Sequence, residues 1–238
     1  MSLAKVLLLG KEYTDVLLSV PDVIIGETNL CDTKKTALGG VNNIPPALGT
    51  EVLYAIETRG KKDAFIINDT YKSQRTAFVI NKEPALLTPG DIESFAAFEW
   101  AHIAYADDFE DIDKIPDLKI PYSLDFCTLN NRAPYRDIIE NATLVFDSRE
   151  RKYLYSSLDV SSLFVFHDEY GVEVVKNKNI LFSVSMTPIR GLEVNGAGDL
   201  FAGYFIKNNF NLDIIEAATV SMEETTQHLQ RTQNGASG

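Results

Sequence analysis

The chain has 238 residues, of which 45% are apolar and 24% are charged, so one domain can bury a substantial core without disulfides or metals. Acidic residues outnumber basic ones by 34 to 22, and the resulting net charge of −12 argues against nucleic acid as a partner. The two cysteines, Cys31 and Cys127, lie far apart and the first apolar run is too short to cross a bilayer, so we expect a cytoplasmic protein that binds no membrane.

The first predicted element is a strand at residues 6–9, an apolar run that Gly10 ends. Continuous apolar runs are typical of strands buried on both faces of a mainly parallel sheet. Segments with helical spacing lie between several such runs, and this alternation predicts an α/β fold in which helices cover the sheet. We assign residues 1–238 to a single domain. The other predicted strands are residues 51–56, 64–67, 76–80, 102–106, 144–146 and 163–166, and the predicted helices are residues 91–98, 135–140 and 197–207.

Two further segments, residues 16–25 and 75–80, have strand character but no helix after them. We therefore expect them to pair outside the main sheet as a small β lid, with strands drawn from about residues 12–38 and 64–82. If the lid strands expose a free edge, pairing with a second copy of the chain would give a homodimer.

The sharpest local feature is the string Asn195-Gly196-Ala197-Gly198-Asp199, which an apolar helical stretch follows. Its glycines let the backbone turn tightly, and the free amides of a helix start attract phosphate oxygens. A carboxylate at the next position would lie beside the reacting atoms. In the purely structural interpretation, Asp199 only caps a helix and the glycines only form a turn. The string is not a dinucleotide fingerprint, because Gly203 comes five residues after Gly198 rather than three. A Walker loop is disfavoured, because no Gly-Lys-Ser/Thr string occurs in the sequence.

This string resembles the C-terminal signature of the ribokinase (PfkB) family of carbohydrate kinases, and three other motifs follow the family's order. Leu38-Gly39-Gly40-Val41-Asn42-Asn43 is similar to the N-terminal Gly-Gly motif, and Asp15 matches the substrate-binding aspartate. Asp147-Ser148-Arg149-Glu150 resembles the Asn-x-x-Glu element, with aspartate in place of asparagine. The resemblance implies a ribokinase-like three-layer sandwich with a mainly parallel central sheet and a small β lid.

The resemblance also implies a function: an ATP-dependent kinase that phosphorylates a hydroxyl of a sugar or a sugar-like molecule. Without the resemblance, Gly39-Gly40 is equally well a strand-to-helix turn, and Asp147 and Glu150 are nearly as well solvated charges. The implied site consists of a catalytic group (Asp199, Gly196, Ala197 and Gly198), a substrate-binding group (Asp15, Gly39, Gly40 and Asn43), nucleotide-binding residues (Asn195, Gly196 and Gly198), and Asp147 and Glu150, which act mainly through water on Mg²⁺.

Several positions depart from the family pattern. The interval from Gly49 to Arg75 is short, as though a helix and a strand had been trimmed, and Arg75 lies where the family often has a lid residue near the substrate. Residues 167–171 replace threonine and glycine near the nucleotide with a histidine and two acidic residues. Asp125 resembles a mid-chain aspartate, but the arginine expected soon after it arrives late, as Arg132.

These departures keep two alternatives open. One is a nucleoside kinase, and the other is a non-catalytic descendant of the fold that binds a nucleotide or a sugar. We expect the adenine pocket near residues 217–224, and a structural or surface role for the three histidines, because they show no ligand spacing.

Overall fold

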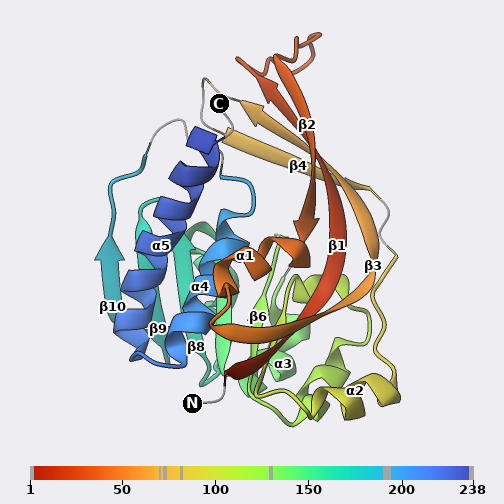
Figure 1. Ribbon diagram of the computed structural model, residues 1–238, viewed down its shortest axis with the longest axis vertical. Helices are drawn as coiled ribbons and strands as arrows, with labels where there is room; N and C mark the ends of the chain where they lie inside the picture. The colour runs from red at the N-terminus through yellow and green to blue at the C-terminus, as the bar shows by residue number, and fades with distance from the viewer. Residues whose placement is uncertain are drawn as a thin grey trace.

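The computed structural model describes residues 3–69, 71, 74–80, 83–128, 131–189 and 194–235. In these residues, a ten-stranded sheet has the order β10-β9-β8-β7-β6-β5-β1-β3-β4, and β2 pairs with β1 outside this row (Figure 1). Neighbours from β8 to β3 run parallel, whereas the outer pairs are antiparallel. The strands are β1 Ala4–Val20, β2 Thr33–Gly40, β3 Val52–Asp69, β4 Gln74–Ile80, β5 Trp100–Ile103, β6 Tyr122–Asp125, β7 Leu144–Ser148, β8 Leu163–Asp168, β9 Gly171–Lys176 and β10 Asn179–Ser185.

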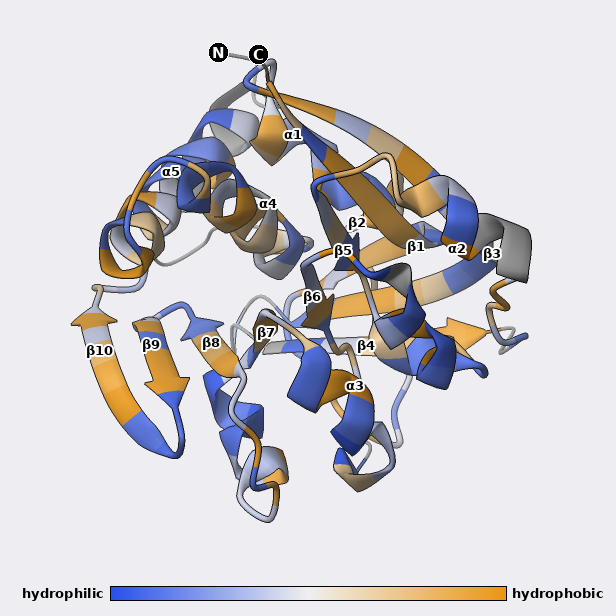
Figure 2. Ribbon diagram, turned by 90° about the horizontal axis from the view of Figure 1, so that it is seen from below, coloured by the Kyte–Doolittle hydropathy of each residue, from blue (hydrophilic) through white to orange (hydrophobic). Residues whose placement is uncertain are grey.

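Helices cover both faces of the sheet (Figure 2). Alternate side chains of β1 point to opposite faces, so Val6 and Leu8 pack in one core cluster and Leu7 and Leu9 in another. The first cluster contains residues of α1, α4 and α5, and the second contains residues of α2 and α3. The predicted three-layer α/β architecture is confirmed. The helices are α1 Pro45–Leu48, α2 Pro89–Phe95, α3 Arg136–Asn141, α4 Ala197–Asn209 and α5 Ile214–Gly235.

The lid is continuous with the main sheet, because β1 and β3 extend beyond the helical layers and stay paired along their length (Figure 1). A register shift between Gly10 and Glu12 marks the passage from core to lid. Within the lid, β2 pairs with β1 and β4 pairs with β3, both antiparallel. This confirms a small β lid. The proposed domain and lid limits stay predictions, and residues 70, 72, 73, 81 and 82 lie outside the described part.

Some sequence-based boundaries are wrong for identifiable reasons. The predicted strands at 51–56 and 64–67 are one strand, β3, because the polar residues between them remain paired with β1. The chain therefore passes from core to lid with no intervening helix, which explains the short interval before Arg75. β5 ends at Ile103 rather than at residue 106, because Tyr105 adopts a left-handed backbone conformation with φ 58°. Strands β6, β9 and β10 were not predicted.

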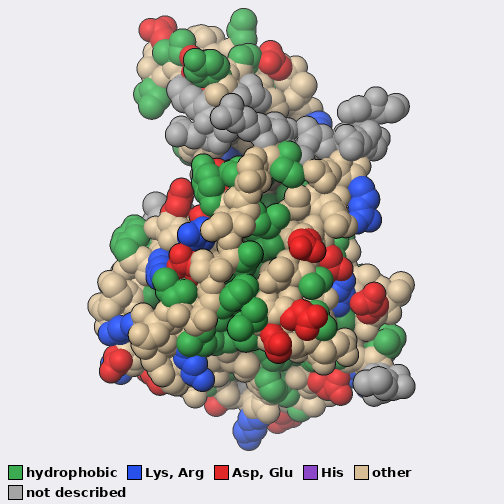
Figure 3. Space-filling model, turned by 90° about the vertical axis from the view of Figure 1, so that its left-hand side faces the viewer, with side chains coloured by type: hydrophobic (Ala, Val, Ile, Leu, Met, Phe, Trp, Pro, Cys, Tyr) green, Lys and Arg blue, Asp and Glu red, His purple; other side chains and the backbone are tan. Residues whose placement is uncertain are grey.

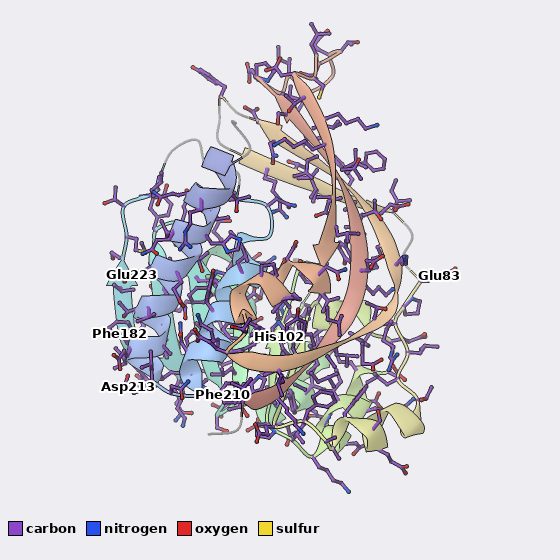
Figure 4. All side chains as sticks on the ribbon, in the orientation of Figure 1. Glu83, His102, Phe182, Phe210, Asp213 and Glu223 are labelled. Atoms are coloured by element: carbon purple, nitrogen blue, oxygen red, sulfur yellow. The ribbon has the colours of Figure 1, made fainter. Side chains whose placement is uncertain are left out.

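His102 has the predicted structural role. Figure 4 labels it near the middle of the molecule, and its side chain is fully buried. Its Nδ1 lies 2.9 Å from the Ser123 hydroxyl, which also accepts a hydrogen bond from Trp100 Nε1. Burial lowers the pKa of His102 to about 3, so the ring is neutral and serves the packing of the sheet.

The surface over α5 and β10 carries acidic, basic and apolar side chains interspersed with one another (Figure 3). Among the described helices, none combines the length and the apolar composition that a bilayer span requires.

Candidate active site

The first turn of α4 presents unpaired amide groups. Gly196 has φ 75°, a left-handed conformation that favours glycine, and its carbonyl accepts the hydrogen bond from Leu200 N at 2.9 Å that begins the helix. The amide of Ala197 donates to Val194 O at 3.1 Å, so it is not available to bind a phosphate oxygen, contrary to the prediction. No described acceptor takes the amides of Gly196 and Gly198. These two amides are therefore the donors of the predicted cradle that remain available.

Only one of the two oxygens of the Asp199 carboxylate accepts hydrogen bonds from described side chains. The residue is 4% exposed, and its Oδ2 accepts hydrogen bonds from Asn43 Nδ2 at 2.8 Å and from Tyr105 Oη at 2.9 Å. Burial raises its pKa to about 6, although both hydrogen bonds act in the opposite direction. A carboxylate tuned in this way is deprotonated at neutral pH yet is a stronger base than an exposed aspartate.

Asp15 lies on the lid side of the same cluster. Its side chain is 4% exposed, and Asn195 Nδ2 donates to its Oδ2 at 3.0 Å. Its other oxygen, Oδ1, is buried and has no hydrogen-bond partner in the described part of the chain. A buried acceptor without a donor is unfavourable unless a ligand supplies one. Asp15 Oδ1 is therefore placed to accept a hydrogen bond from a ligand hydroxyl.

The Gly-Gly motif makes this arrangement sterically feasible. A Cβ at Gly39 would overlap the carboxylate of Asp15, with its Cγ only 2.7 Å away, so only glycine leaves that carboxylate in place. Gly40 ends β2, and the 3₁₀ turn Val41–Asn43 after it delivers Asn43 to Asp199. The structure thus brings the predicted acceptor-side residues and the start of α4 together. The role of Asn195 in nucleotide binding stays a prediction, because its amide nitrogen contacts Asp15.

A cleft of about 720 Å³ adjoins the cradle on the side of α5. Ala197 and Gly198 line it from α4, and Arg75 lines it from the lid. Glu150 lines it from the 3₁₀ helix after β7, and His167 lines it from the end of β8. Its volume is in the usual range of small-molecule sites. Of the segment expected to hold adenine, Met222 is on the wall, followed by Thr225, Thr226 and Leu229.

The altered stretch at residues 167–171, which begins within β8, repels phosphate less than its two acidic residues alone indicate. His167 lies close to Gly198, because a Cβ added there would be 3.2 Å from the ring. Burial lowers the pKa of His167 to about 3, so its ring is uncharged at neutral pH. Asp168 and Glu169 both line the cleft, and Asp168 pairs with Arg149 at 3.3 Å, so Glu169 is the acidic residue of this stretch for which no ion pair is found in the described part of the chain.

Asp147, which the sequence resemblance assigns to metal binding, is fully buried in an ion-pair network. Its Oδ2 accepts from Arg132 Nη2 at 3.0 Å and from Tyr155 Oη at 2.6 Å, and its Oδ1 accepts from Arg151 Nε. Both oxygens are occupied, so Asp147 is not free to bind a metal directly. Among the described residues, no cluster of three or more His, Cys, Asp or Glu side chains could hold an ion. A water-mediated role for Asp147 and Glu150 stays a prediction.

Sequence analysis missed the roles of two residues of this region. Tyr105 follows β5, and its only sequence signal was a polar aromatic residue near the end of a predicted strand. Arg132 looked displaced from its family position, yet it is fully buried and neutralises Asp147. Asp125, at the end of β6, is also buried, and burial with the charges of Asp199 and Asp147 raises its pKa well above the usual value.

Comparisons with known proteins agree with this geometry at the level of the fold. No protein-family model and no curated protein sequence matches the chain. Among solved structures, a ribokinase from Cryptococcus neoformans var. grubii serotype A in complex with ADP aligns with a TM-score of 0.73 and 11% identity over 92% of this chain and 91% of that one. A nucleoside kinase from Burkholderia thailandensis in complex with inosine gives 0.68 and 15% over 92% and 89%. A ribokinase from Arabidopsis thaliana with ribose and ATP gives 0.64 and 10% over 92% and 90%. The fold is therefore ribokinase-like, as predicted.

Proposed function

We propose that this chain is an ATP-dependent kinase that phosphorylates a hydroxyl group of a sugar or a sugar-like small molecule. The position of Asp199 is the observation that supports this most strongly. Its carboxylate lies in the first turn of α4, directly after Ala197 and Gly198, which line a cleft of about 720 Å³, and it is electrostatically coupled to Asp15, whose Oδ1 has no donor among the described residues. A base between an acceptor site and a phosphate cradle is what phosphoryl transfer to an alcohol requires.

In the proposed reaction, Asp199 is the general base. An alcohol hydroxyl does not ionise at neutral pH, so its proton has to leave as the new oxygen–phosphorus bond forms. Asp199 accepts that proton, while Asp15 holds a second hydroxyl and orients the acceptor. The unpaired amides of Gly196 and Gly198 donate to the transferring phosphoryl oxygens, where negative charge accumulates. Arg75 of the lid faces the same cleft and adds positive charge.

We propose that the cleft binds ATP together with Mg²⁺. When bound, Mg²⁺ would offset the negative charge of the nucleotide phosphates while keeping most of its hydration shell. Glu150 lines the cleft, and we propose that it contacts the ion through water. Asp147 contributes indirectly, because its pairing with Arg151 fixes a cation that also lines the cleft.

The proposal leaves two rivals to be tested. The Burkholderia neighbour is a nucleoside kinase, and an acceptor that carries a base on its sugar would use the same hydroxyl contacts. The other rival is a descendant of the fold that binds but does not catalyse, and the carboxylate of Glu169 in the cleft favours it. We prefer the enzyme, because a binding module has no need of a buried carboxylate whose pKa is raised to about 6 beside the cradle.

ADP release from ATP and Mg²⁺, measured over a panel of sugars and nucleosides, separates these alternatives. We expect at least one acceptor to stimulate ADP release, and the preferred acceptor decides between sugar and nucleoside. Thermal unfolding with and without ATP is measured in parallel. If ATP raises the melting temperature while every acceptor leaves ADP release at background, the non-catalytic rival is correct.

We further propose that the lid pairs with a second copy of the chain. Strand pairing places Leu38, Phe65, Phe78 and Ile80 on the lid face opposite to Asp15, and these four side chains are 61%, 39%, 53% and 53% exposed. Phe65, Phe78 and Ile80 are neighbours on this face, whereas Thr14 and Asp63 separate Leu38 from them. An exposed apolar cluster of this kind often marks an interface. A second copy would cover it with the same surface, as in a two-fold dimer.

Sedimentation velocity at micromolar concentration tests this pairing. We expect a dimer for the natural sequence and a monomer for Phe78→Asp, because a charge within the apolar cluster opposes its burial. Ile180→Asp is the matched control, since Ile180 is 55% exposed on β10 at the far edge of the sheet. A monomeric natural protein, or a dimer that only the control disrupts, would exclude the lid as the interface.

A further inference from the structure

Tyr105 has an unusual backbone conformation for its residue type. It lies just after β5 with φ 58° and ψ 62°, in the left-handed region that non-glycine residues rarely occupy. A bulky residue held in this region is strained, and such strain tends to persist where it positions a functional group. The contacts of the Tyr105 side chain indicate which group this conformation positions.

The hydroxyl of Tyr105 donates to Asp199 Oδ2 at 2.9 Å. Its ring packs against the ring of Tyr13 on β1, with centroids 5.3 Å apart. Tyr13 is fixed in turn, because its own hydroxyl donates to Asp108 Oδ2 at 2.7 Å and Asp108 pairs with Lys62 on β3. Contacts from the lid strands therefore determine where the hydroxyl of Tyr105 lies.

The two oxygens of the Asp199 carboxylate are consequently unlike. Oδ2 already accepts two hydrogen bonds, from Asn43 and Tyr105, whereas no described residue donates to Oδ1. The geometry points to Tyr105 as a positioning residue that holds Oδ2, so that Oδ1 is the atom that receives the acceptor's proton. This inference rests on the proposed kinase function. In the step, the acceptor oxygen bonds to the γ-phosphorus, the bond from that phosphorus to the β–γ bridging oxygen breaks, and the hydroxyl proton moves to Oδ1.

The hydroxyl of Tyr105 also tunes the base. Burial raises the pKa of Tyr105 well above its usual value, so the phenol stays protonated and remains a donor. Its hydrogen bond lowers the pKa of Asp199, as do Asn43 and, from β4, the charge of Arg75. The charge of Asp15 on β1 acts in the opposite direction, and Asp125 on β6 is the other carboxyl group that is electrostatically coupled to Asp199. Removing the hydroxyl of Tyr105 should therefore raise the pKa of Asp199 above about 6.

Tyr105→Phe tests the inference, because it removes the hydroxyl and keeps the ring. We expect the acidic limb of the kcat/KM profile to move upward by about one pH unit, and kcat to fall about tenfold with little change in the KM for ATP. Tyr122→Phe is the matched control, since the buried hydroxyl of Tyr122 donates to Ile138 O in the core. It should lower the melting temperature without moving the limb. An unmoved limb in Tyr105→Phe would overturn the positioning role.

A second measurement keeps this inference separate from the kinase proposal. The pKa of Asp199 is followed by carbon NMR in labelled protein, and Asp199→Asn identifies its signal. If no acceptor turns over but the pKa rises in Tyr105→Phe, the kinase proposal fails and the hydrogen-bond tuning stands. If the pKa is unchanged, the inference about Tyr105 fails whatever the activity.

Discussion

Asp199→Asn is expected to lower turnover by about 10³-fold and to leave the Kd for ATP unchanged. Loss of a general base typically costs about 10² to 10⁴ in rate. The amide of asparagine is nearly isosteric, and its oxygen can still accept the hydrogen bonds from Asn43 and Tyr105, so the fold should persist. Single-turnover phosphoryl transfer and calorimetric titration with ATP measure the two quantities. A variant that keeps more than a tenth of the natural rate would show that Asp199 is not the base.

The same substitution should stabilise the protein at neutral pH. The pKa of Asp199 is raised to about 6 in the folded protein, so the folded state binds this proton more tightly than the unfolded state does. Its contribution to stability is therefore greatest at low pH, falls as the pH rises from about 4 to 6, and is constant above that range. Asparagine avoids this loss. We expect unfolding free energies on the order of 1–3 kcal/mol higher than natural at pH 7–8, and a difference that vanishes near pH 4.

Arg132→Met is expected to destabilise the protein by about 3–5 kcal/mol, because it leaves the charge of Asp147 buried without its fully buried partner. Arg132 and Asp147 have no exposed side-chain surface, and methionine fills much of the lost volume without a charge. Urea unfolding measures the effect. If Asp147 were mainly a metal site, added Mg²⁺ would restore the stability of the variant, and that result would contradict a structural role for the pair.

Arg149→Met is the matched control. Arg149 pairs with Asp168 and Glu173, but its side chain is 27% exposed, so solvent screens the interaction. Partly exposed pairs of this kind are worth about 0–1 kcal/mol. We therefore expect a much smaller loss for Arg149→Met than for Arg132→Met. Equal losses of unfolding free energy in the two variants would mean that burial does not make the Arg132–Asp147 pair more important for stability.

Sequence reasoning located those parts of the site that local chemistry specifies. The turn at Gly196 and the helix that begins at Ala197 are encoded within a few neighbouring residues, and the strand from Val6 to Leu9 is a continuous apolar run. The residues that contact these elements in the fold are not encoded nearby in the sequence. Tyr105 reaches Asp199 across 94 residues of sequence, and only the fold brings them together.

Misreadings of the sequence had a common physical cause. The polar middle of β3 looked like a break between two strands, yet pairing with β1 holds it extended. The alternative interpretation of Asp147 as a solvated charge at the end of a strand is wrong, because Arg132, Tyr155 and Arg151 enclose it. In both cases tertiary contacts outweighed the local preference of polar residues for water, and no short motif records such contacts.

Phosphorus NMR of a mixture of ATP, Mg²⁺ and the acceptor panel tests the central claim most directly. The kinase proposal predicts that a phosphate monoester and ADP accumulate in equal amounts with the natural protein, and that neither accumulates with Asp199→Asn. Unchanged ATP spectra with every acceptor, in samples where ATP demonstrably protects the protein from thermal unfolding, would contradict it.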